Sequence, residues 1–289
     1  MKTFFFKLML LFLPMLAGIA LINYRIDPLH LFYGSYYEKA GVLLKDHNIV
    51  FESSDEKKLL VEFLKHKNDS DVLVFGSSRT AIIDSQHLNK PVLNLCTSHV
   101  LLEDVVAAYG LYISNHEPPK EIYIGLDPWY FNDHKINDEA FYLQPHYAFM
   151  LEKMQAPAKV MQIPVLKEMG IYDKSKQLFS FNYLQNSMVS ILRNGFAESG
   201  PKLASSNDLF VKQSNGVLHY KDAWQANPDD VETAVRRELS AENLHGTKGY
   251  EELSPGKLKL LKNFLDYLRN QKISVTLLLT PYHPEIWKH

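Results

Sequence analysis

The sequence contains a single cysteine among its 289 residues, and its formal net charge is only −2. One thiol, Cys96, cannot form an internal disulfide, so the hydrophobic core must hold the fold together. Thirty-one lysines and arginines are balanced by 33 aspartates and glutamates, and no basic cluster stands out. The charge pattern therefore gives no support for a nucleic-acid partner.

Signatures of metal and nucleotide sites are also missing. The 12 histidines are scattered, without a His-x-His or His-x-x-x-His pair, so we expect no metal site and no cofactor. The glycine turn at residues 76–79 lacks the spaced glycines and the lysine of a phosphate-binding P-loop. The composition, 46% hydrophobic and 22% charged, is that of an ordinary globular protein.

One long apolar run is present, at the N-terminus. It extends from Phe4 to Ile22 and is interrupted only by Lys7, Pro14 and Gly18. Its length matches the roughly 17–25 residues that a membrane-spanning helix needs. Lys2, Lys7 and the amino terminus place positive charge at the N-terminal end of this run, whereas Arg25 alone follows its C-terminal end. This bias predicts that the N-terminus lies in the cytoplasm.

We therefore predict an uncleaved signal anchor over residues 1–25, with the rest of the chain exported. The alternative is a cleaved signal peptide, with Gly18 and Ala20 as the small residues before the cut. Residues 26–70 then form a juxtamembrane connector and a first helix, in which apolar residues recur at helical spacing between Asp55 and Lys67.

From residue 71 onwards, short apolar runs alternate with amphipathic segments. The runs lie at 71–76, 91–95, 121–126 and 273–279, and helical periodicity marks 101–113 and 258–268. Strands that alternate with helices predict a parallel sheet covered on both faces, which is an α/β fold. We assign residues 71–289 to this domain. The weaker pattern at about 132–250 is interpreted as a helical and loop insertion.

Polar residues follow each predicted strand, and in parallel sheets ligands bind beyond the carboxyl ends of the strands. Ser77, Ser78 and Arg79 follow the first strand, residues 94–99 the second, Asp127 the third and His283 the fourth. A serine, a carboxylate and a histidine at one edge are the groups that nucleophilic acyl transfer requires.

The segment at 72–81 is the most informative of these. Gly76 allows a tight turn off the strand, and we expect a serine to start a helix whose backbone N–H groups hold an oxyanion. A plain strand–turn–helix, with Ser77 or Ser78 as its N-cap, is the alternative interpretation.

Phe75-Gly76-Ser77-Ser78-Arg79 resembles the first sequence block of the SGNH/GDSL hydrolase superfamily. The resemblance implies a flavodoxin-like three-layer parallel sheet in which Ser78 is the nucleophile. Asn94-Leu-Cys-Thr-Ser-His99 resembles the second block, so a backbone N–H near Ser98 or His99 would contribute to the oxyanion hole, although the family usually has glycine where His99 stands. Asp127 replaces the asparagine of the third block and cannot donate its hydrogen bond as a carboxylate.

Within that superfamily the chain is similar to membrane-anchored cell-envelope acylation proteins of the DltD-like and alginate-acetylation-like kinds. An N-terminal anchor, an early Asp27-Pro28 and the segment Leu126–Phe131 carry this likeness. It implies a single-pass protein of a bacterial cell membrane, with its domain on the extracytoplasmic side. The implied activity is a serine esterase or O-acyltransferase acting on envelope glycopolymers, with an acyl donor and an integral membrane acyltransferase as partners. Apart from the resemblance, Arg79 stands beside Ser78 and could steady an anionic substrate, although a surface ion pair is the commoner role of such a residue.

The C-terminal segment departs from the family pattern. The base histidine of the family lies in Asp-x-x-His, but Thr280-Pro281-Tyr282-His283 has no aspartate three residues before His283. Three interpretations follow: the chain is truncated before its catalytic pair, His283 acts with another orienting group such as Asp127, or the site is inactive. In the last case the protein is a non-catalytic scaffold or polysaccharide-binding subunit. Trp129 could stack on sugars, but packing is the commoner role of such aromatics, and Cys96 is expected to be a small buried residue.

Overall fold

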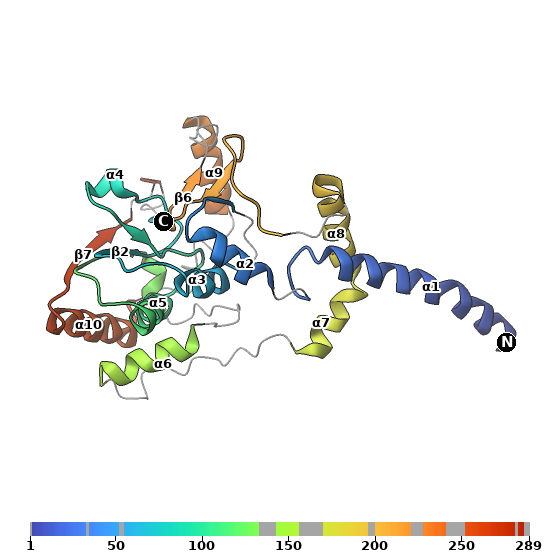
Figure 1. The fold of residues 1–289 in the computed structure, drawn as a ribbon, viewed down its shortest axis with the longest axis horizontal. Coiled ribbons are helices and arrows are strands. Elements are labelled where there is room, and N and C mark those ends of the chain that lie inside the picture. The colour runs from blue at the N-terminus through green and yellow to red at the C-terminus, as the bar shows by residue number, and fades with distance from the viewer. Residues whose placement is uncertain are drawn as a thin grey trace. The chain divides into compact units, whose positions relative to one another are not determined.

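The chain folds into two compact units. A computed structural model describes residues 2–32, 35–51, 55–132, 143–155, 170–195, 200–220, 228–240, 252–280 and 283–285. Unit 1 comprises Met1–Ala40 and Lys167–Pro201, and unit 2 comprises Gly41–Leu166 and Lys202–His289 (Figure 1). The segment predicted as one insertion thus supplies elements to both units.

Unit 2 is built on a parallel four-stranded sheet with the order β3-β2-β4-β7. Its strands are β2 (Val72–Phe75), β3 (Leu93–Asn94), β4 (Glu121–Leu126) and β7 (Ser274–Leu279). Leu73 is in register with Leu93 on one side and with Ile122 on the other. All four predicted strands are present, and the predicted α/β class is confirmed.

Helices cover one face of this sheet (Figure 1). Those next to the strands are α5 (Leu102–Asn115) and α10 (Pro255–Asn270), and α3 (Glu56–Leu64) and α6 (Gln144–Lys153) pack against α5. The ring of Tyr109 in α5 lies 6.4 Å from that of Phe75 and 5.5 Å from that of Phe264 in α10. Edge-on ring contacts of this kind join β2, α5 and α10 into one core.

The other face is covered near β2 and β3 by a small antiparallel sheet rather than by helices. This sheet has the order β1-β5-β6, with β1 (Ile49–Val50), β5 (Phe210–Lys212) and β6 (Leu218–Tyr220). Val72 and Val74 pack with Ala81 and Leu218 in a buried cluster. Unit 2 also contains the one-turn helix α4 (Ser85–Leu88) and α9 (Pro228–Ser240).

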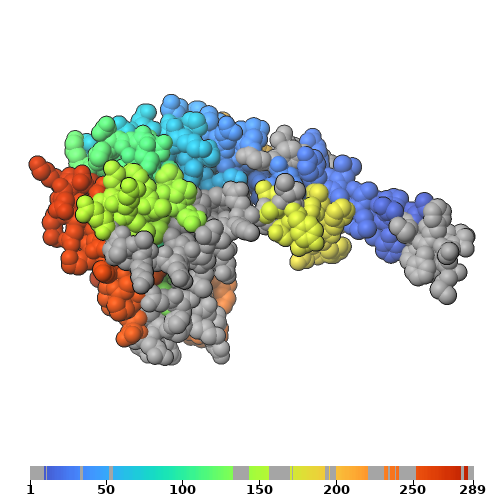
Figure 2. Space-filling view, turned by 90° about the horizontal axis from the view of Figure 1, so that it is seen from below, coloured from blue at the N-terminus to red at the C-terminus, as the bar shows by residue number. Residues whose placement is uncertain are grey.

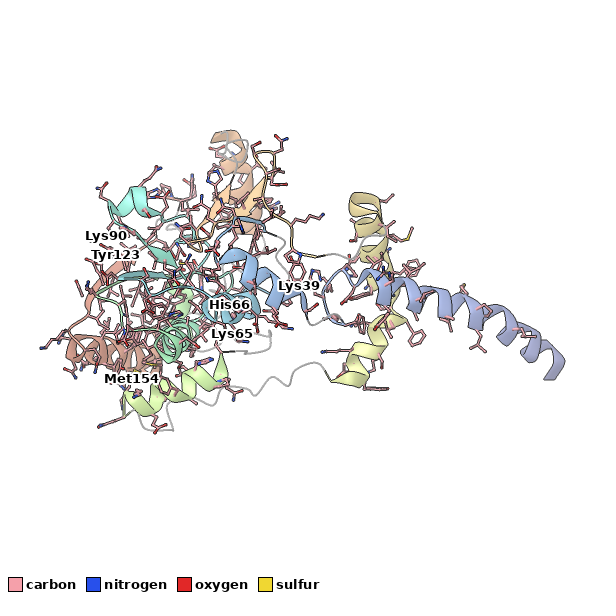
Figure 3. The ribbon with its side chains drawn as sticks, viewed as in Figure 1. Lys39, Lys65, His66, Lys90, Tyr123 and Met154 are labelled. Carbon is pink, nitrogen blue, oxygen red and sulfur yellow. The ribbon has the colours of Figure 1, made fainter. Side chains whose placement is uncertain are left out.

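The amino edge of the sheet carries one half-buried and one exposed ion pair. Lys90 Nζ lies 2.6 Å from a carboxylate oxygen of Glu121 and 6.0 Å from the ring centroid of Tyr123, and Figure 3 shows Lys90 beside Tyr123. Lys120 pairs in the same region with Asp71 at 2.8 Å. Such solvated pairs contribute little to stability, so we assign this edge no role in a site.

Unit 1 is helical. It contains α1 (Lys2–Ile26), α7 (Ile171–Leu178), α8 (Phe181–Asn194) and the first part of α2 (Ser35–Leu44). Asn23 of α1 donates to the carbonyl of Leu178 at 2.8 Å and accepts from the Ser187 hydroxyl at 3.0 Å. Asp27 accepts from the Tyr183 hydroxyl at 2.6 Å. Buried polar bonds therefore fix α7 and α8 to the C-terminal end of α1.

Within the described part of the chain, no helix combines the length and the apolar character that crossing a membrane requires. The N-terminal anchor accordingly stays a prediction.

Two glycines at the carboxyl end of the sheet make room for the side chain of Thr80. A Cβ atom on Gly125 of β4 would lie 2.5 Å from Thr80 Cγ2, and one on Gly76 would lie 2.3 Å from Thr80 Oγ1. We expect Gly125→Ala to lower the free energy of unfolding of the protein by about 1–3 kcal/mol, because the added methyl group overpacks this site. Urea unfolding followed by circular dichroism measures the change.

Two variants control this prediction. A Cβ on Gly256 of α10 would meet Ser254 Oγ at an ordinary 3.5 Å, so Gly256→Ala is expected to leave stability nearly unchanged. Thr80→Ser removes Cγ2, the methyl group with which the new Cβ at position 125 would clash. Combined with Gly125→Ala, it should therefore restore part of the lost stability. Equal stability of Gly125→Ala and the parent protein would contradict the packing described.

Candidate functional site

Strand β2 is followed by hydrogen-bonded turns and not directly by a helix. Gly76 has φ +145°, a conformation that residues with a Cβ rarely adopt, and residues 77–82 then form turns. The Thr80 N–H donates to the carbonyl of Ser77 at 3.0 Å, and that of Ile83 donates to the carbonyl of Thr80 at 3.1 Å. The prediction that a serine here starts a helix is wrong, since the next helix is α4, which Asp84 caps.

Asn94 explains why the turn does not continue as a helix. Its side-chain amide donates to the carbonyls of Thr80 at 2.9 Å and Ile83 at 3.0 Å, and its Oδ1 accepts from the N–H of Cys96 at 3.0 Å. Asn94 is buried at the end of β3. A satisfied buried amide of this kind fixes the turn against the sheet. The sequence shows only a polar residue that closes an apolar run, which is a weak signal for this role.

The two adjacent serines have opposite surroundings. Ser77 is 2% exposed, and its hydroxyl oxygen accepts from the backbone N–H of Arg79 at 3.3 Å. Ser78 is exposed, and among the described residues its hydroxyl makes no hydrogen bond. Ser78 is therefore the serine that a substrate can reach.

The loop after β3 lies beside this turn, because the Thr97 N–H donates to the carbonyl of Gly76 at 3.2 Å. The next N–H, that of Ser98, donates to Oε2 of Glu56 at 3.0 Å. The predicted oxyanion donor is thus already bound to a carboxylate oxygen of α3. This N–H can therefore donate to a negatively charged oxygen. The oxyanion of a substrate would have to displace Glu56 before it could accept from the same N–H.

His99 is exposed and has φ +51°, in the left-handed region that glycine adopts freely. The backbone at this position therefore has a glycine-like conformation even though the side chain is histidine.

Asp127 joins the ends of three strands. Its Oδ1 accepts from the Thr280 hydroxyl at 2.7 Å and lies 3.3 Å from Nη1 of Arg79. The side chain is buried, and among the described residues Oδ2 has no hydrogen-bond partner. Arg79 follows β2 and Asp127 follows β4, so the predicted meeting of polar groups at the carboxyl edge is observed for these two. Thr280, which follows β7, was not among the predicted residues, and His283 stood in its place. Asp127 acts here as an acceptor, as expected of a carboxylate.

Trp129 holds the other side of Arg79. The guanidinium carbon lies 5.1 Å from the centroid of the Trp129 ring, and the indole N–H donates to the carbonyl of Val100 at 3.0 Å. Trp129 is buried in a short 3₁₀ helix, Pro128–Phe131, so packing is its role, as the sequence favoured. The Arg79 side chain is still 23% exposed. Asp127 and Trp129 therefore orient a cation that solvent and ligands can reach.

Among the described residues, no hydrogen bond joins His283 to Arg79, Asp127 or Thr280. It is half-buried, and its Nδ1 accepts from the N–H of Glu285 at 3.3 Å. No hydrogen bond between described residues joins it to Ser78 or to Asp127. The neighbouring Pro281 and Tyr282 lie outside the described residues. The structure thus places the candidate nucleophile and the Arg79–Asp127–Thr280 group at one edge, and no base is hydrogen-bonded to Ser78 among the described residues.

No set of three metal-ligating side chains gathers within the described ranges.

Cys96 is fully buried, as predicted, with its sulfur 3.2 Å from Thr80 Oγ1. Burial raises the pKa of the Cys96 thiol to about 12. We expect no alkylation by iodoacetamide in the folded protein at about pH 8.5, because the thiolate is the reactive form. Full alkylation is expected in concentrated urea. Rapid labelling of the folded protein, read by intact mass, would show that Cys96 is accessible.

Comparison with protein-family models, with curated proteins and with solved structures finds no match to this chain.

Proposed function

We propose that the chain is a membrane-anchored, exported serine esterase or O-acyltransferase of the SGNH-like kind, acting on envelope glycopolymers. The observation that carries the proposal is the position of Ser78, exposed at the carboxyl end of β2 while Ser77 and Thr80 on either side are buried. The strand order supports it: numbered along the chain, the parallel strands run 2-1-3-4, the order of flavodoxin-like sheets.

The proposed reaction has two steps. The Ser78 oxygen attacks the carbonyl carbon of an acyl donor, its proton passes to a base, and the donor's leaving group departs with a proton to give an acyl-serine. A sugar hydroxyl then attacks this ester and releases Ser78, whereas water in its place gives hydrolysis. Backbone N–H groups at Ser98 and His99 would hold the carbonyl oxygen once Glu56 is displaced. Arg79 would bind negative charge on the polymer.

The base is the component that this proposal adds. His283 lies three residues beyond Thr280, whose hydroxyl donates to Asp127. It is therefore close to the site along the sequence. For His283 to act, its ring has to reach hydrogen-bond distance of Ser78 when substrate binds. A histidine outside this chain is the alternative base.

The proposed anchor is α1. The side chains from Phe12 to Leu16, with Pro14 among them, are all apolar and exposed. A helix that is apolar on every side is typical of a buried or membrane-spanning segment, and this stretch is not buried by protein. The anchor would leave unit 2 on the extracytoplasmic side.

Hydrolysis of p-nitrophenyl acetate by the detergent-solubilised full chain tests the enzymatic proposal. We expect saturable turnover above the buffer rate and above that of the heat-denatured protein. Turnover no faster than with the denatured protein would contradict it.

A non-catalytic scaffold or polysaccharide-binding subunit is the second candidate. Two observations favour it: the Ser78 hydroxyl has no hydrogen-bonded base among the described residues, and the N–H of Ser98 is taken by Glu56. Under this function, Ser78→Ala should bind an anionic envelope polysaccharide, such as alginate, as tightly as the parent protein does in a sedimentation assay. Binding that requires the Ser78 hydroxyl would count against the scaffold.

A further inference from the structure

A buried lysine without a carboxylate partner lies beside the loop that follows β3. Lys212 of β5 is 7% exposed, and no carboxylate of the described residues forms an ion pair with it. Its ammonium donates to the carbonyl of Cys96 at 3.5 Å and lies 5.7 Å from the ring centroid of Phe51. One long hydrogen bond satisfies only part of a group with three donors. Since a buried charge without a counter-charge is costly, Lys212 has a reason to gain a further partner.

Lys212 stands on a face of the small sheet that is otherwise apolar. Lys212 is opposite Leu218 in the β5–β6 pair, and Phe210, two residues earlier on the same face, is opposite Tyr220. Leu218 belongs to the buried cluster between the two sheets, and Tyr220 packs against that cluster. An apolar side chain would fill this position without burying a charge, so packing does not account for the lysine.

Glu56 holds the next peptide group of the same loop. Lys212 binds the carbonyl oxygen of the peptide group that joins residues 96 and 97. Oε2 of Glu56 accepts from the N–H of the following peptide group, at Ser98, at 3.0 Å. Burial is the main cause of the raised pKa of the Cys96 thiol, whereas the charge of Lys212 lowers this pKa and that of Glu56 raises it. The cation and the carboxylate therefore lie within electrostatic reach of one side chain, although no ion pair joins them.

The backbone of α3 is fixed on both sides of Glu56, but the Glu56 side chain is not. The side chain of Asp55 caps the helix by accepting a backbone N–H of its first turn at 3.1 Å. Lys57 is paired with Asp104 of α5, and Figure 2 shows the light-blue atoms of α3 next to the green atoms of α5. Glu56 itself is half-buried, and its carboxylate bonds among the described residues only to the N–H of Ser98. Rotation about its side-chain bonds is enough to move this carboxylate.

We propose that Lys212 is a positioning residue that frees the N–H of Ser98: when the oxyanion of a substrate takes this N–H, the Glu56 carboxylate moves to the Lys212 ammonium. We call this exchange the Glu56–Lys212 latch. Glu56 closes the oxyanion site in the free protein, and Lys212 provides a second partner for the displaced carboxylate. The inference rests on the proposed serine enzyme, in which the Ser98 N–H holds the carbonyl oxygen.

The exchange is favourable for both charged groups. The carboxylate leaves one charge-assisted hydrogen bond and enters another, and the buried ammonium gains the counter-charge that it lacks in the free protein. A substrate therefore opens the oxyanion site at a smaller cost than it would if Glu56 had to move into water.

Hydrolysis of p-nitrophenyl acetate by the full chain tests the role of Lys212. We expect Lys212→Met to lower kcat/KM about tenfold, because a hydrogen bond to a charged group is worth about one order of magnitude in an equilibrium constant. Glu56→Gln should raise kcat/KM, and adding Lys212→Met to Glu56→Gln should then cost nothing. Lys65→Met is the matched control. It removes an ammonium of α3 (Figure 3) that pairs with Glu62, is 49% exposed and should leave turnover unchanged.

Nuclear magnetic resonance follows the latch independently of turnover. Thr97-Ser98 is the only Thr-Ser pair in the sequence, so isotopic labelling of threonine at its carbonyl carbon and of serine at its nitrogen selects the amide signal of Ser98. A bond to a carboxylate moves an amide proton downfield, so we expect this signal to lie further upfield in Glu56→Gln.

Sodium acetate at constant ionic strength serves as the competing anion in the same spectra. Half-saturation of the Ser98 signal should need about tenfold more acetate in Lys212→Met than in the parent protein, for the reason that lowers kcat/KM. In Glu56→Gln, half-saturation should need the same acetate concentration with and without Lys212→Met.

Three outcomes would overturn the latch. The first is a Ser98 signal that Glu56→Gln leaves unchanged, and the second is a Ser98 signal that acetate moves in no variant. The third is a loss of acetate binding in Lys212→Met that persists in the Glu56→Gln background, which would make Lys212 a direct anion ligand or a purely structural residue. The expected Ser98 shifts in a protein that hydrolyses the ester no faster than its denatured form would support the exchange and refute the proposed enzyme.

Discussion

Ser78→Ala is expected to reduce acetyl-ester turnover by about 10³-fold or more, since loss of a catalytic nucleophile leaves only binding and oxyanion stabilisation. The substitution should not disturb the fold. Ser78 is exposed, and its hydroxyl has no hydrogen bond to another described residue, so stability should change by less than about 0.5 kcal/mol. Steady-state kinetics and circular dichroism of the full chain measure the two effects.

Ser77→Ala is the matched control for this prediction. The Ser77 hydroxyl is buried and accepts from the Arg79 N–H, so its loss should cost about 1 kcal/mol of stability. Most turnover should remain. Unchanged turnover in Ser78→Ala would exclude Ser78 as the nucleophile, and loss of turnover in Ser77→Ala alone would assign that role to its neighbour.

Lys57→Met is expected to lower the free energy of unfolding of the protein by about 3–5 kcal/mol, because it leaves a buried carboxylate without its cation. Lys57 of α3 and Asp104 of α5 form an ion pair at 3.1 Å in which each side chain is only 2% exposed. Asp104 also accepts from the N–H of Leu101 at the start of α5. The pair therefore fixes α3 to the helix that follows the candidate oxyanion loop.

Two variants separate the buried charge from the loss of packing. The double variant Lys57→Met with Asp104→Asn removes both charges and keeps an acceptor for Leu101, so it should be more stable than Lys57→Met alone. Lys120→Met breaks the exposed pair with Asp71, whose side chains are 78% and 66% exposed, and should cost no more than about 1 kcal/mol. Equal losses in Lys57→Met and Lys120→Met, measured by urea unfolding, would contradict a buried pair.

The main sheet could be predicted from the sequence because strands buried on both faces read as continuous apolar runs. Val72–Phe75 is such a run, buried at every position and followed by Gly76. Glu121–Leu126 is apolar after its first residue and is followed by Asp127, but Glu121, Tyr123 and Leu126 are only half-buried. The second sheet could not be predicted. Strand β5 has only three residues and pairs with β1, about 160 residues earlier along the chain, so no local periodicity marks it, and its region was expected to be a loop.

The location of the candidate site was predictable for a similar reason. Parallel strands bring their carboxyl ends to one edge, and Arg79, Asp127 and Thr280 do meet there. The partners of individual groups were not predictable. Glu56 reaches Ser98 across 42 residues of sequence, and Asn94 binds the carbonyls that a helix after Ser78 would have used. Such contacts depend on how elements pack together, which local sequence patterns do not encode.

The most direct test of the account is covalent labelling of the folded full chain with a fluorophosphonate, mapped by mass spectrometry after proteolysis. These reagents react with a serine that a nearby base activates and hardly at all with an ordinary serine. The account predicts one adduct, on Ser78, and none on Ser77. A folded protein that takes up no fluorophosphonate at Ser78 would contradict a serine enzyme that acts with a base of this chain, and would leave either the scaffold or a serine whose base lies outside the chain.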